Sequence, residues 1–152
     1  MKKANIGVVC LARKTFDFEC ALQIYHKTIN DLERFDDINW SFISELIIEP
    51  KEAQSAGENL AADNLDGLII ISGTFHLGHL ALILNKYIHC PVLFWGFNEL
   101  PYNGGKIRLN SVCGVNLNAS NYYKTGNDSY CYHIGESIDE NWLNAIRMKT
   151  SL

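Results

Sequence analysis

The stretch Ile-Gly-Val-Val-Cys-Leu at residues 6–11 decides the fold. It is short, apolar on both faces and rich in β-branched residues, which is typical of a central strand in a parallel sheet. Residues 18–35 follow with apolar side chains at helical spacing and polar side chains between them, so a long helix is predicted next. A buried strand followed at once by an amphipathic helix indicates a βαβ unit.

The same alternation continues along the chain. Aromatic and β-branched residues at 39–48 predict a second strand, which Pro50 is expected to stop because proline cannot donate to a ladder. Further apolar runs predict strands at 68–72, 92–95 and 130–134. Helices are expected at 51–63, 76–88, 118–124 and 139–149. The last two helices have candidate caps, which are Asn116 or Asn118 for the first and Ser137 or Asp139 for the second.

Strands that alternate with helices imply a parallel sheet with helices on both faces, because right-handed crossovers leave few other arrangements. We therefore predict a single domain over residues 1–152, a three-layer, doubly wound α/β fold of the flavodoxin-like or Rossmann-like kind. The expected strand order is 2-1-3-4-5. In such sheets ligands bind outside the carboxyl ends of the strands, so the loops that follow the strands are the candidate site.

Composition excludes several classes of protein. The 152 residues are 47% hydrophobic, which suits one core, and 13 Lys+Arg against 17 Asp+Glu give a net charge of -4 with no basic arm for nucleic acid. No apolar run approaches the roughly 20 residues that span a bilayer, and the start lacks a signal sequence, so a cytoplasmic protein is expected. The five cysteines indicate neither a disulfide framework nor a zinc site; three of them are expected in strand-like apolar surroundings, namely Cys10, Cys113 and Cys131.

The loop after the first strand is Ala-Arg-Lys-Thr-Phe-Asp at residues 12–17. It lacks the Gly-x-Gly-x-x-Gly pattern of a dinucleotide site. Arg13 and Lys14 could hold a carboxylate, a phosphate or a sugar hydroxyl, or they could simply be solvated. Asp17 is placed to complement the dipole of the helix that follows.

The loop after the third strand is Ser-Gly-Thr-Phe-His-Leu-Gly-His at residues 72–79. It shares the Gly-x-x-x-x-Gly frame of a P-loop, but the required Lys-Ser/Thr is missing, so ATP and GTP are not expected. Ser72 stands where a receiver domain needs an aspartate. His76 and His79 could share one helical face and ligate a metal, but nothing at regular spacing completes a site, so we expect them to contact a substrate or a partner instead.

The loop after the fourth strand, at residues 95–120, mixes aromatic residues with Asn, Ser, Glu and Arg. Aromatic faces beside fixed amides are a usual means of holding a polyhydroxylated ligand. Asn and Gly also serve turns with positive φ, so sugar recognition and plain turn chemistry both remain open.

Taken together, these loops resemble the N-terminal domain of the L-fucose/L-arabinose isomerase family, nearly from end to end. The segments that carry the resemblance are residues 72–79, 91–101 and 104–111. Residues 116–120, Asn-Leu-Asn-Ala-Ser, also look like the Asn-Leu-Asn-Gln-Ser of arabinose isomerases, with Ala119 in place of the glutamine.

The resemblance implies an aldose–ketose isomerase. In this family a divalent metal, typically manganese, holds the sugar oxygens while a carboxylate shuttles a proton through an enediol. The resemblance implies that the metal ligands lie in central and C-terminal domains, which are not expected in this chain. No catalytic residue, metal ligand or bound cofactor is therefore expected here, whereas Mn²⁺ or another divalent metal is expected in the full-length enzymes. The N-terminal domain helps to build a homo-oligomer and lends loops to a neighbouring subunit's active site.

The residues expected to contact the sugar are Arg13, Phe16, His76, His79, Trp95, Asn116, Asn118 and Ser120. Three hypotheses remain open. The chain is the N-terminal domain of a sugar isomerase and inactive alone, or it is a stand-alone, non-catalytic module that binds a sugar or a partner. The third is a small enzyme that uses His76 or His79 as an acid–base group, because imidazole titrates near neutrality.

Overall fold

The computed structural model describes residues 2–101, 104–105 and 107–152 of the chain. Within these residues a single sheet contains five parallel strands in the order β2-β1-β3-β4-β5, which confirms the predicted order. The strands are β1 (Ala4–Leu11), β2 (Ile38–Phe42), β3 (Gly67–Ser72), β4 (Val92–Gly96) and β5 (Tyr130–Ile134). Because all pairings are parallel, the carboxyl ends of the strands meet along one edge of the sheet.

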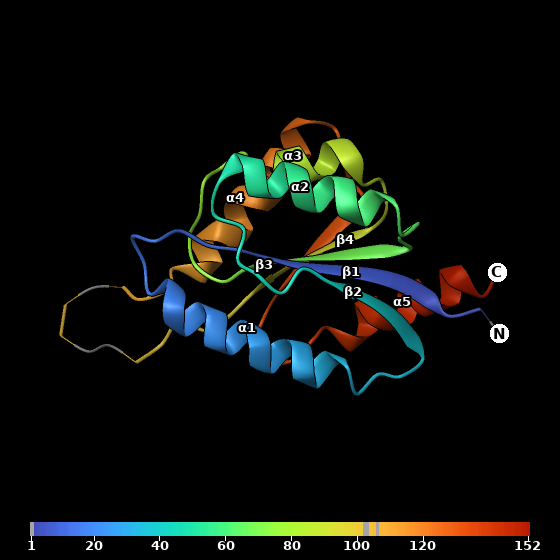
Figure 1. Cartoon of the computed structure of the whole chain (residues 1–152), viewed down its shortest axis with the longest axis horizontal. Helices are drawn as coiled ribbons and strands as arrows, with labels where there is room; N and C mark the ends of the chain where they lie inside the picture. The colour runs from blue at the N-terminus through green and yellow to red at the C-terminus, as the bar shows by residue number, and fades with distance from the viewer. Residues whose placement is uncertain (1, 102–103, 106) are drawn as a thin grey trace.

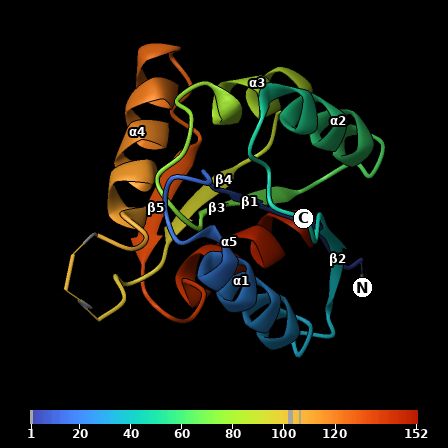
Figure 2. The same cartoon turned by 60° about the vertical axis from the view of Figure 1, so that its left-hand side comes forward.

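The helices in this part of the chain are α1 (Phe18–Leu32), α2 (Pro50–Ala61), α3 (Leu80–Tyr87), α4 (Ser111–Lys124) and α5 (Glu140–Thr150). Figure 1 shows α2, α3 and α4 on one face of the sheet and α1 and α5 on the other, and the turned view in Figure 2 shows the same layers. The predicted three-layer α/β fold is thereby confirmed. Among the described residues, no helix has the length and apolar character that a membrane crossing requires.

The core is divided in two by the sheet. Alternate side chains of β1 point to opposite faces, so Ile6 and Val8 pack with α1 and α5, while Val9 and Leu11 pack with α2, α3 and α4. All four of these side chains are fully buried, which explains why this strand is apolar on both faces.

The second strand is shorter than predicted. β2 ends at Phe42 rather than at residue 48. After Phe42 the chain no longer pairs with β1 in a regular way. Two backbone hydrogen bonds to β1 remain, from the amides of Ile43 and Ile47 to carbonyls of β1 at 3.0 and 2.8 Å. Pro50 does not stop the strand; it is the first residue of α2, a position that suits proline because its amide would have no partner there.

The third helix begins later than predicted. α3 starts at Leu80 instead of at residue 76. The residues before it are engaged elsewhere, since the amide of Phe75 donates to the carbonyl of Leu109 at 2.8 Å. His76 and His79 therefore do not share a helical face, because the first precedes the helix and the second is its N-cap residue.

The fourth helix begins earlier than predicted. α4 starts at Ser111, and Asn110 precedes it with a left-handed backbone (φ 54°). The proposed caps Asn116 and Asn118 lie inside this helix, so that prediction is wrong. Gly114 and the many Asn and Ser residues disfavour a helix locally, and close packing of Gly114 on β3 overrides this preference.

One of the two caps proposed for the last helix is confirmed, since an oxygen of Asp139 accepts the amides of Asn141 and Trp142. The predictions for the cysteines are confirmed at one position and wrong at another. Cys10 is buried in β1, as expected, whereas Cys113 is exposed on α4, so its predicted strand-like surroundings are wrong.

Candidate functional site

The candidate site is the carboxyl edge of the sheet, where three loops follow β1, β3 and β4. We call these loops the rim and define it by their described residues, which are 12–17, 73–79 and 97–101 with 104–105 and 107–110. The strand order places the topological switch point between β1 and β3, which is where open α/β sheets bind ligands. At this switch point the loop after β1 is hydrogen-bonded to the loop after β3, since the amide of Arg13 donates to the Thr74 hydroxyl at 2.8 Å. The rings of Phe16 and Phe75 also meet edge to face, with centroids 6.2 Å apart.

The third loop of the rim is tied to the first by an ion pair. Arg108 donates to one carboxylate oxygen of Asp17 through Nη2 at 2.7 Å and through Nε at 3.1 Å. The amide of Asp17 donates in return to the carbonyl of Arg108 at 2.9 Å. The hydrogen bonds from the guanidinium and from the amide of Cys20 hold the pKa of Asp17 below its usual range. Asp17 is therefore both the cap of α1 and the anchor of a distant loop.

Glu99 organises the same loop from within. Its carboxylate accepts the amides of Leu100, Leu109 and Asn110 at 2.8, 2.9 and 3.0 Å. Partial burial would raise its pKa, but these amides and the nearby Arg108 outweigh it and hold the pKa of Glu99 below its usual range. This carboxylate is committed to the backbone, so it is not a free acid–base group.

Beneath the rim lies a buried polar cluster formed by Ser72, His76, Ser111 and Asn118. Nδ1 of His76 lies 3.0 Å from the carbonyl oxygen of Leu77, which can only accept, so Nδ1 carries the proton. Nε2 is then an acceptor for the Ser72 hydroxyl at 2.9 Å. Burial lowers the pKa of His76 to about 4, against the opposing effect of the Leu77 carbonyl, so the ring is neutral near pH 7.

The cluster is closed by α4. The amide nitrogen of Asn118 donates to the Ser72 hydroxyl at 3.3 Å, while its oxygen Oδ1 is buried without a partner among the described residues. The Ser111 hydroxyl donates to the carbonyl of Ser72 and accepts the amide of Phe97 at 2.8 Å. Gly114 permits this approach, since a Cβ there would lie 2.9 Å from Ser72 and 3.0 Å from Nε2 of His76.

Two cavities open on the rim. One of about 370 Å³ is lined by Thr15, Phe16, Asp17, Gly104, Gly105, Ile107 and Arg108. The other, of about 350 Å³, is lined by Arg13, Lys14, Thr15, Ile48, Glu49 and Leu77. Residues 12–17 thus contribute to both hollows, and each volume lies at the lower end of the range found for small-molecule sites.

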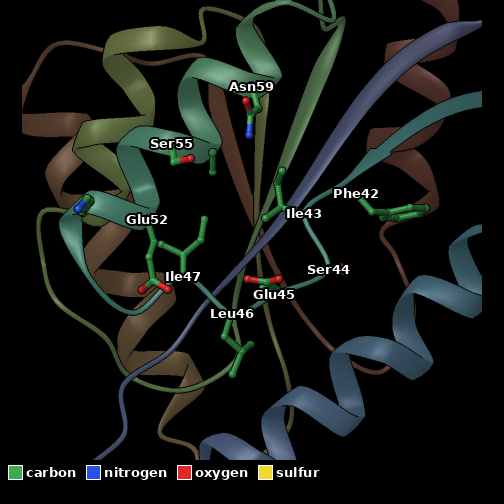
Figure 3. Close-up of a pocket in the computed structure, with 11 residues that line it drawn as sticks. Phe42, Ile43, Ser44, Glu45, Leu46, Ile47, Glu52, Ser55 and Asn59 are labelled. Carbon is green, nitrogen blue, oxygen red and sulfur yellow. The ribbon is translucent and has the colours of Figure 1, made fainter.

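A larger cavity, of about 500 Å³, lies between residues 42–47 and α2, beside the β2 side of the sheet (Figure 3). Its lining includes the carboxylate of Glu52, but that group accepts the amides of Ile48 and Glu49 at 3.0 and 2.8 Å and serves the start of α2. The cavity holds none of the residues predicted to contact a sugar. We place the candidate site at the rim, because the switch point and the joined loops are there.

The predicted sugar contacts separate into accessible and buried side chains. Arg13, His79, Asn116 and Ser120 are exposed, Phe16 is half-buried, and His76, Trp95 and Asn118 are buried. Trp95 points into the core below α1 and α5 and donates to the carbonyl of Gly135 at 2.9 Å. Ser120 lies about 13 Å along α4 from its start, since each helical residue rises about 1.5 Å. The rim itself brings together Arg13, Phe16 and the loop that carries both histidines.

Sequence reasoning missed the residues that hold the rim together: Ser72, Thr74, Glu99, Arg108, Ser111 and Gly114. Three of them have partners that are remote in sequence, since Arg108 pairs with Asp17, Thr74 accepts the amide of Arg13, and Ser111 donates to the carbonyl of Ser72. The position of Asp17 just before a predicted helix indicated a role at the start of that helix, but it did not indicate the ion pair with Arg108.

No group of three His, Cys, Asp or Glu side chains that could hold a metal ion occurs in the described part of the chain. Both ring nitrogens of His76 are already engaged by Ser72 and Leu77. The residues present therefore do not fit a metal centre, and we assign no chemical step through a metal to this chain.

Comparisons with known proteins support an isomerase relationship. Relatives named sulfoquinovose isomerase from Priestia megaterium (strain ATCC 12872 / QMB1551) and Priestia aryabhattai are each 26% identical over 152 aligned positions, which cover 97% of this chain and 33% of the relative. Another protein of that name, from Clostridium sp. (strain MSTE9), is 32% identical over 79 positions, covering 52% of this chain and 18% of the relative. The chain thus spans about a third of the length of the Priestia relatives.

Among solved structures, an ABC transporter solute binding protein from Bacillus halodurans C-125 with bound myo-inositol matches 94% of this chain and 63% of its own chain, at 13% identity and a TM-score of 0.42. A likeness of that level supports no statement about function. The family model described as fucose/sulfoquinovose isomerase, N-terminal domain, matches residues 7–141 and so confirms the predicted family. The chain belongs to the family of fucose/sulfoquinovose isomerase N-terminal domains.

Proposed function

We propose that this chain is the substrate-contacting and oligomer-forming N-terminal domain of an aldose–ketose isomerase, and that it has no isomerase activity alone. The observation that carries the proposal is the rim, in which three loops after β1, β3 and β4 are bonded to one another at the switch point of the sheet. The relatives are named for sulfoquinovose, a sulfonated glucose, so a sugar of that class is the proposed substrate.

The accessible and buried side chains have different proposed roles. Arg13, Phe16 and His79 contact the sugar from the rim, because they are exposed or half-buried there. His76 and Asn118 are positioning residues, because they are buried and hydrogen-bonded to Ser72 at the end of β3. Metal-binding and proton-transferring groups are supplied by domains outside this chain, with Mn²⁺ or another divalent ion as the proposed cofactor of the whole enzyme.

Exposed apolar side chains support the proposed oligomer. Tyr132 on β5, an edge strand of the sheet, is 65% exposed, and Tyr123 on the adjacent α4 is 77% exposed. Large exposed side chains beside an open strand edge are typical of contacts between subunits. Sedimentation of the purified chain tests this role: we expect self-association that Tyr132→Glu weakens, while a monomer at every concentration would contradict it.

The contact role is tested by titrating the purified chain with 6-deoxyglucose and sulfoquinovose while amide chemical shifts are recorded, and by assaying the same samples for ketose with added Mn²⁺. We expect shifts confined to the rim and no ketose. Metal-dependent ketose formation by this chain alone would overturn the claim of inactivity. Shifts absent from the rim for both sugars would overturn substrate contact.

A further inference from the structure

The helix α4 has an outer face without charge. This outer face consists of Val112, Cys113, Asn116, Ser120 and Tyr123, which are all exposed, and residues 111–123 contain no Asp, Glu, Lys or Arg. The exposed faces of α1, α2 and α5 each carry both acidic and basic side chains. Depletion of charge together with exposed tyrosine distinguishes the centre of a protein interface from the rest of a surface. The outer face of α4 therefore has the composition of a contact surface.

A second copy of this chain is the partner that suits this face. Two copies that each carry a net charge of -4 repel one another, and in a two-fold contact the residues near the axis meet their own counterparts. A charged residue there would face a like charge, whereas the outer face of α4 brings no like charges together. α4 lies beside the edge strand β5 (Figure 2), and Tyr132 continues the uncharged surface onto this strand, because it points to the α4 side of the sheet with Tyr130 and Ile134.

The inner face of the same helix holds the rim. Besides closing the buried cluster, the Ser111 hydroxyl donates to the carbonyl of Ser72, the last residue of β3. Asn121 donates through Nδ2 to the carbonyl of Gly78 at 2.7 Å. Gly78 directly precedes His79, one of the side chains proposed to contact the sugar. One helix therefore joins the uncharged contact surface to the loop that carries His79.

The sequence of α4 supports a helix only weakly. Eleven of its 14 residues are Ser, Val, Cys, Gly, Asn or Tyr, which all have lower helix propensity than Ala, Leu or Lys. Asn110 precedes the helix with φ 54°, and its side chain makes no capping hydrogen bond within the described part of the chain. Formation of α4 therefore depends on packing, and it is a local equilibrium that contacts on either face can shift.

We propose that contact of a second copy with the outer face of α4 and binding of sugar at the rim strengthen each other, because both favour the formed state of this helix. This inference rests on the proposed function and adds regulation to it, since substrate contact then depends on assembly. Linkage makes the effect reciprocal: a sugar that binds the dimer more tightly must also tighten the dimer.

The test measures the coupling in both directions on the whole chain. Sedimentation gives the dissociation constant of the dimer with and without saturating sulfoquinovose. The sugar is then titrated at chain concentrations about tenfold below and about tenfold above that constant. We expect the sugar to bind at least about fivefold more tightly to the dimer, and to tighten the dimer correspondingly. Hydrogen exchange of the amides of residues 111–123 should slow on addition of sugar and, separately, on dimerisation.

Variants of exposed residues separate the steps. Tyr123→Glu should give a monomer that binds the sugar with the weaker affinity of the unassociated chain. Adding Cys113→Ala and Ser120→Ala to this monomer should restore part of the affinity, because alanine stabilises the helix without a partner. The matched control is Met148→Glu, which places the same charge at an exposed apolar position on α5, across the sheet from α4, and should change neither constant.

The outcomes distinguish this coupling from the proposed function. Self-association with the same sugar affinity below and above the dissociation constant would overturn the coupling and leave both proposed roles standing. Self-association that persists in the Tyr123 variant would overturn the outer face of α4 as the contact. A chain that stays monomeric at every concentration, or that binds no sugar, would overturn the corresponding part of the proposed function and the coupling with it.

Discussion

The hydroxyl of Ser72 lies 2.9 Å from Nε2 of His76, and both side chains are fully buried beneath the rim. The pair joins the last residue of β3 to the loop that follows it, and Asn118 adds a link from α4. A serine beside a histidine suggests an activated nucleophile, but neither atom is accessible here. The pair is instead a support that fixes the path of the rim.

Burial of neutral His76 predicts a pH-dependent stability. The unfolded chain binds a proton on this side chain below about pH 6.5, whereas the folded chain binds it only near its lowered pKa of about 4. The free energy of unfolding should therefore fall as pH is lowered from about 6.5 to about 4, by up to about 3 kcal/mol from this group. Urea denaturation at a series of pH values in this window measures the slope.

The control separates His76 from other titrating groups. His76→Gln should unfold with a shallower dependence on pH in that window, whatever its absolute stability. His79→Gln, at the exposed cap of α3, should keep the slope of the parent chain. Equal slopes in the parent chain and the His76 variant would show that the ring is not neutral and buried in solution.

Gly114→Ala is predicted to destabilise the chain, although alanine is ordinarily the better helix former by about 1 kcal/mol. The added methyl group would lie 2.9 Å from Ser72 and 3.0 Å from His76, so α4 or the cluster must move. We expect a loss of about 1–3 kcal/mol, the usual cost of overpacking. Asn116→Ala on the exposed face of the same helix should change stability by less than about 0.5 kcal/mol. A stabilised Gly114 variant in urea denaturation would contradict the close packing of α4 on β3.

The fold could be predicted because its signals are local and repeated. The apolar run at 6–11, the amphipathic segment after it and their later repeats were enough to predict five strands in a parallel sheet. The order 2-1-3-4-5 was expected because it is the flavodoxin-like arrangement of such sheets, and the structure has that order. The site was harder to predict, because its geometry depends on pairs that are distant in sequence. Asp17 and Arg108 are 91 residues apart, and neither residue type points to the other.

The direction in which individual side chains point also could not be predicted from the local sequence pattern. Trp95 and Asn118 were predicted to face a sugar, yet tertiary packing turns both into the interior. α4 was missed at its start because Gly114 and its polar neighbours favour a loop when considered alone. Packing against β3 makes the first turns of α4 helical. Helix propensities depend only on the local sequence, so they could not predict the effect of this contact.

The Asp17–Arg108 pair is predicted to hold the loop after β4 against the β1 loop. Arg108→Gln should speed hydrogen exchange of the Asp17 amide, which donates to the carbonyl of Arg108 at 2.9 Å, and the parent chain should show the same trend at high salt. Arg147→Gln breaks a similar pair with Asp37 away from the rim and provides the control. Exchange at Asp17 that is unchanged in the Arg108 variant, or faster in the control as well, would refute this local role.

Cysteine reactivity provides a direct check of the corrected fourth helix. Cys113 is exposed on α4, whereas burial raises the pKa of the Cys90 thiol to about 12 and raises that of Cys10 further. Because the thiolate is the reactive form, a thiol reagent at pH 8 should modify Cys113 rapidly in the folded chain and reach Cys10 and Cys90 only after unfolding. Cys113→Ser should remove the rapid phase, and Cys20→Ser should keep it. A rapid phase that persists without Cys113 would show that this side chain is not on an exposed helical face, as would protection of Cys113 in the parent chain.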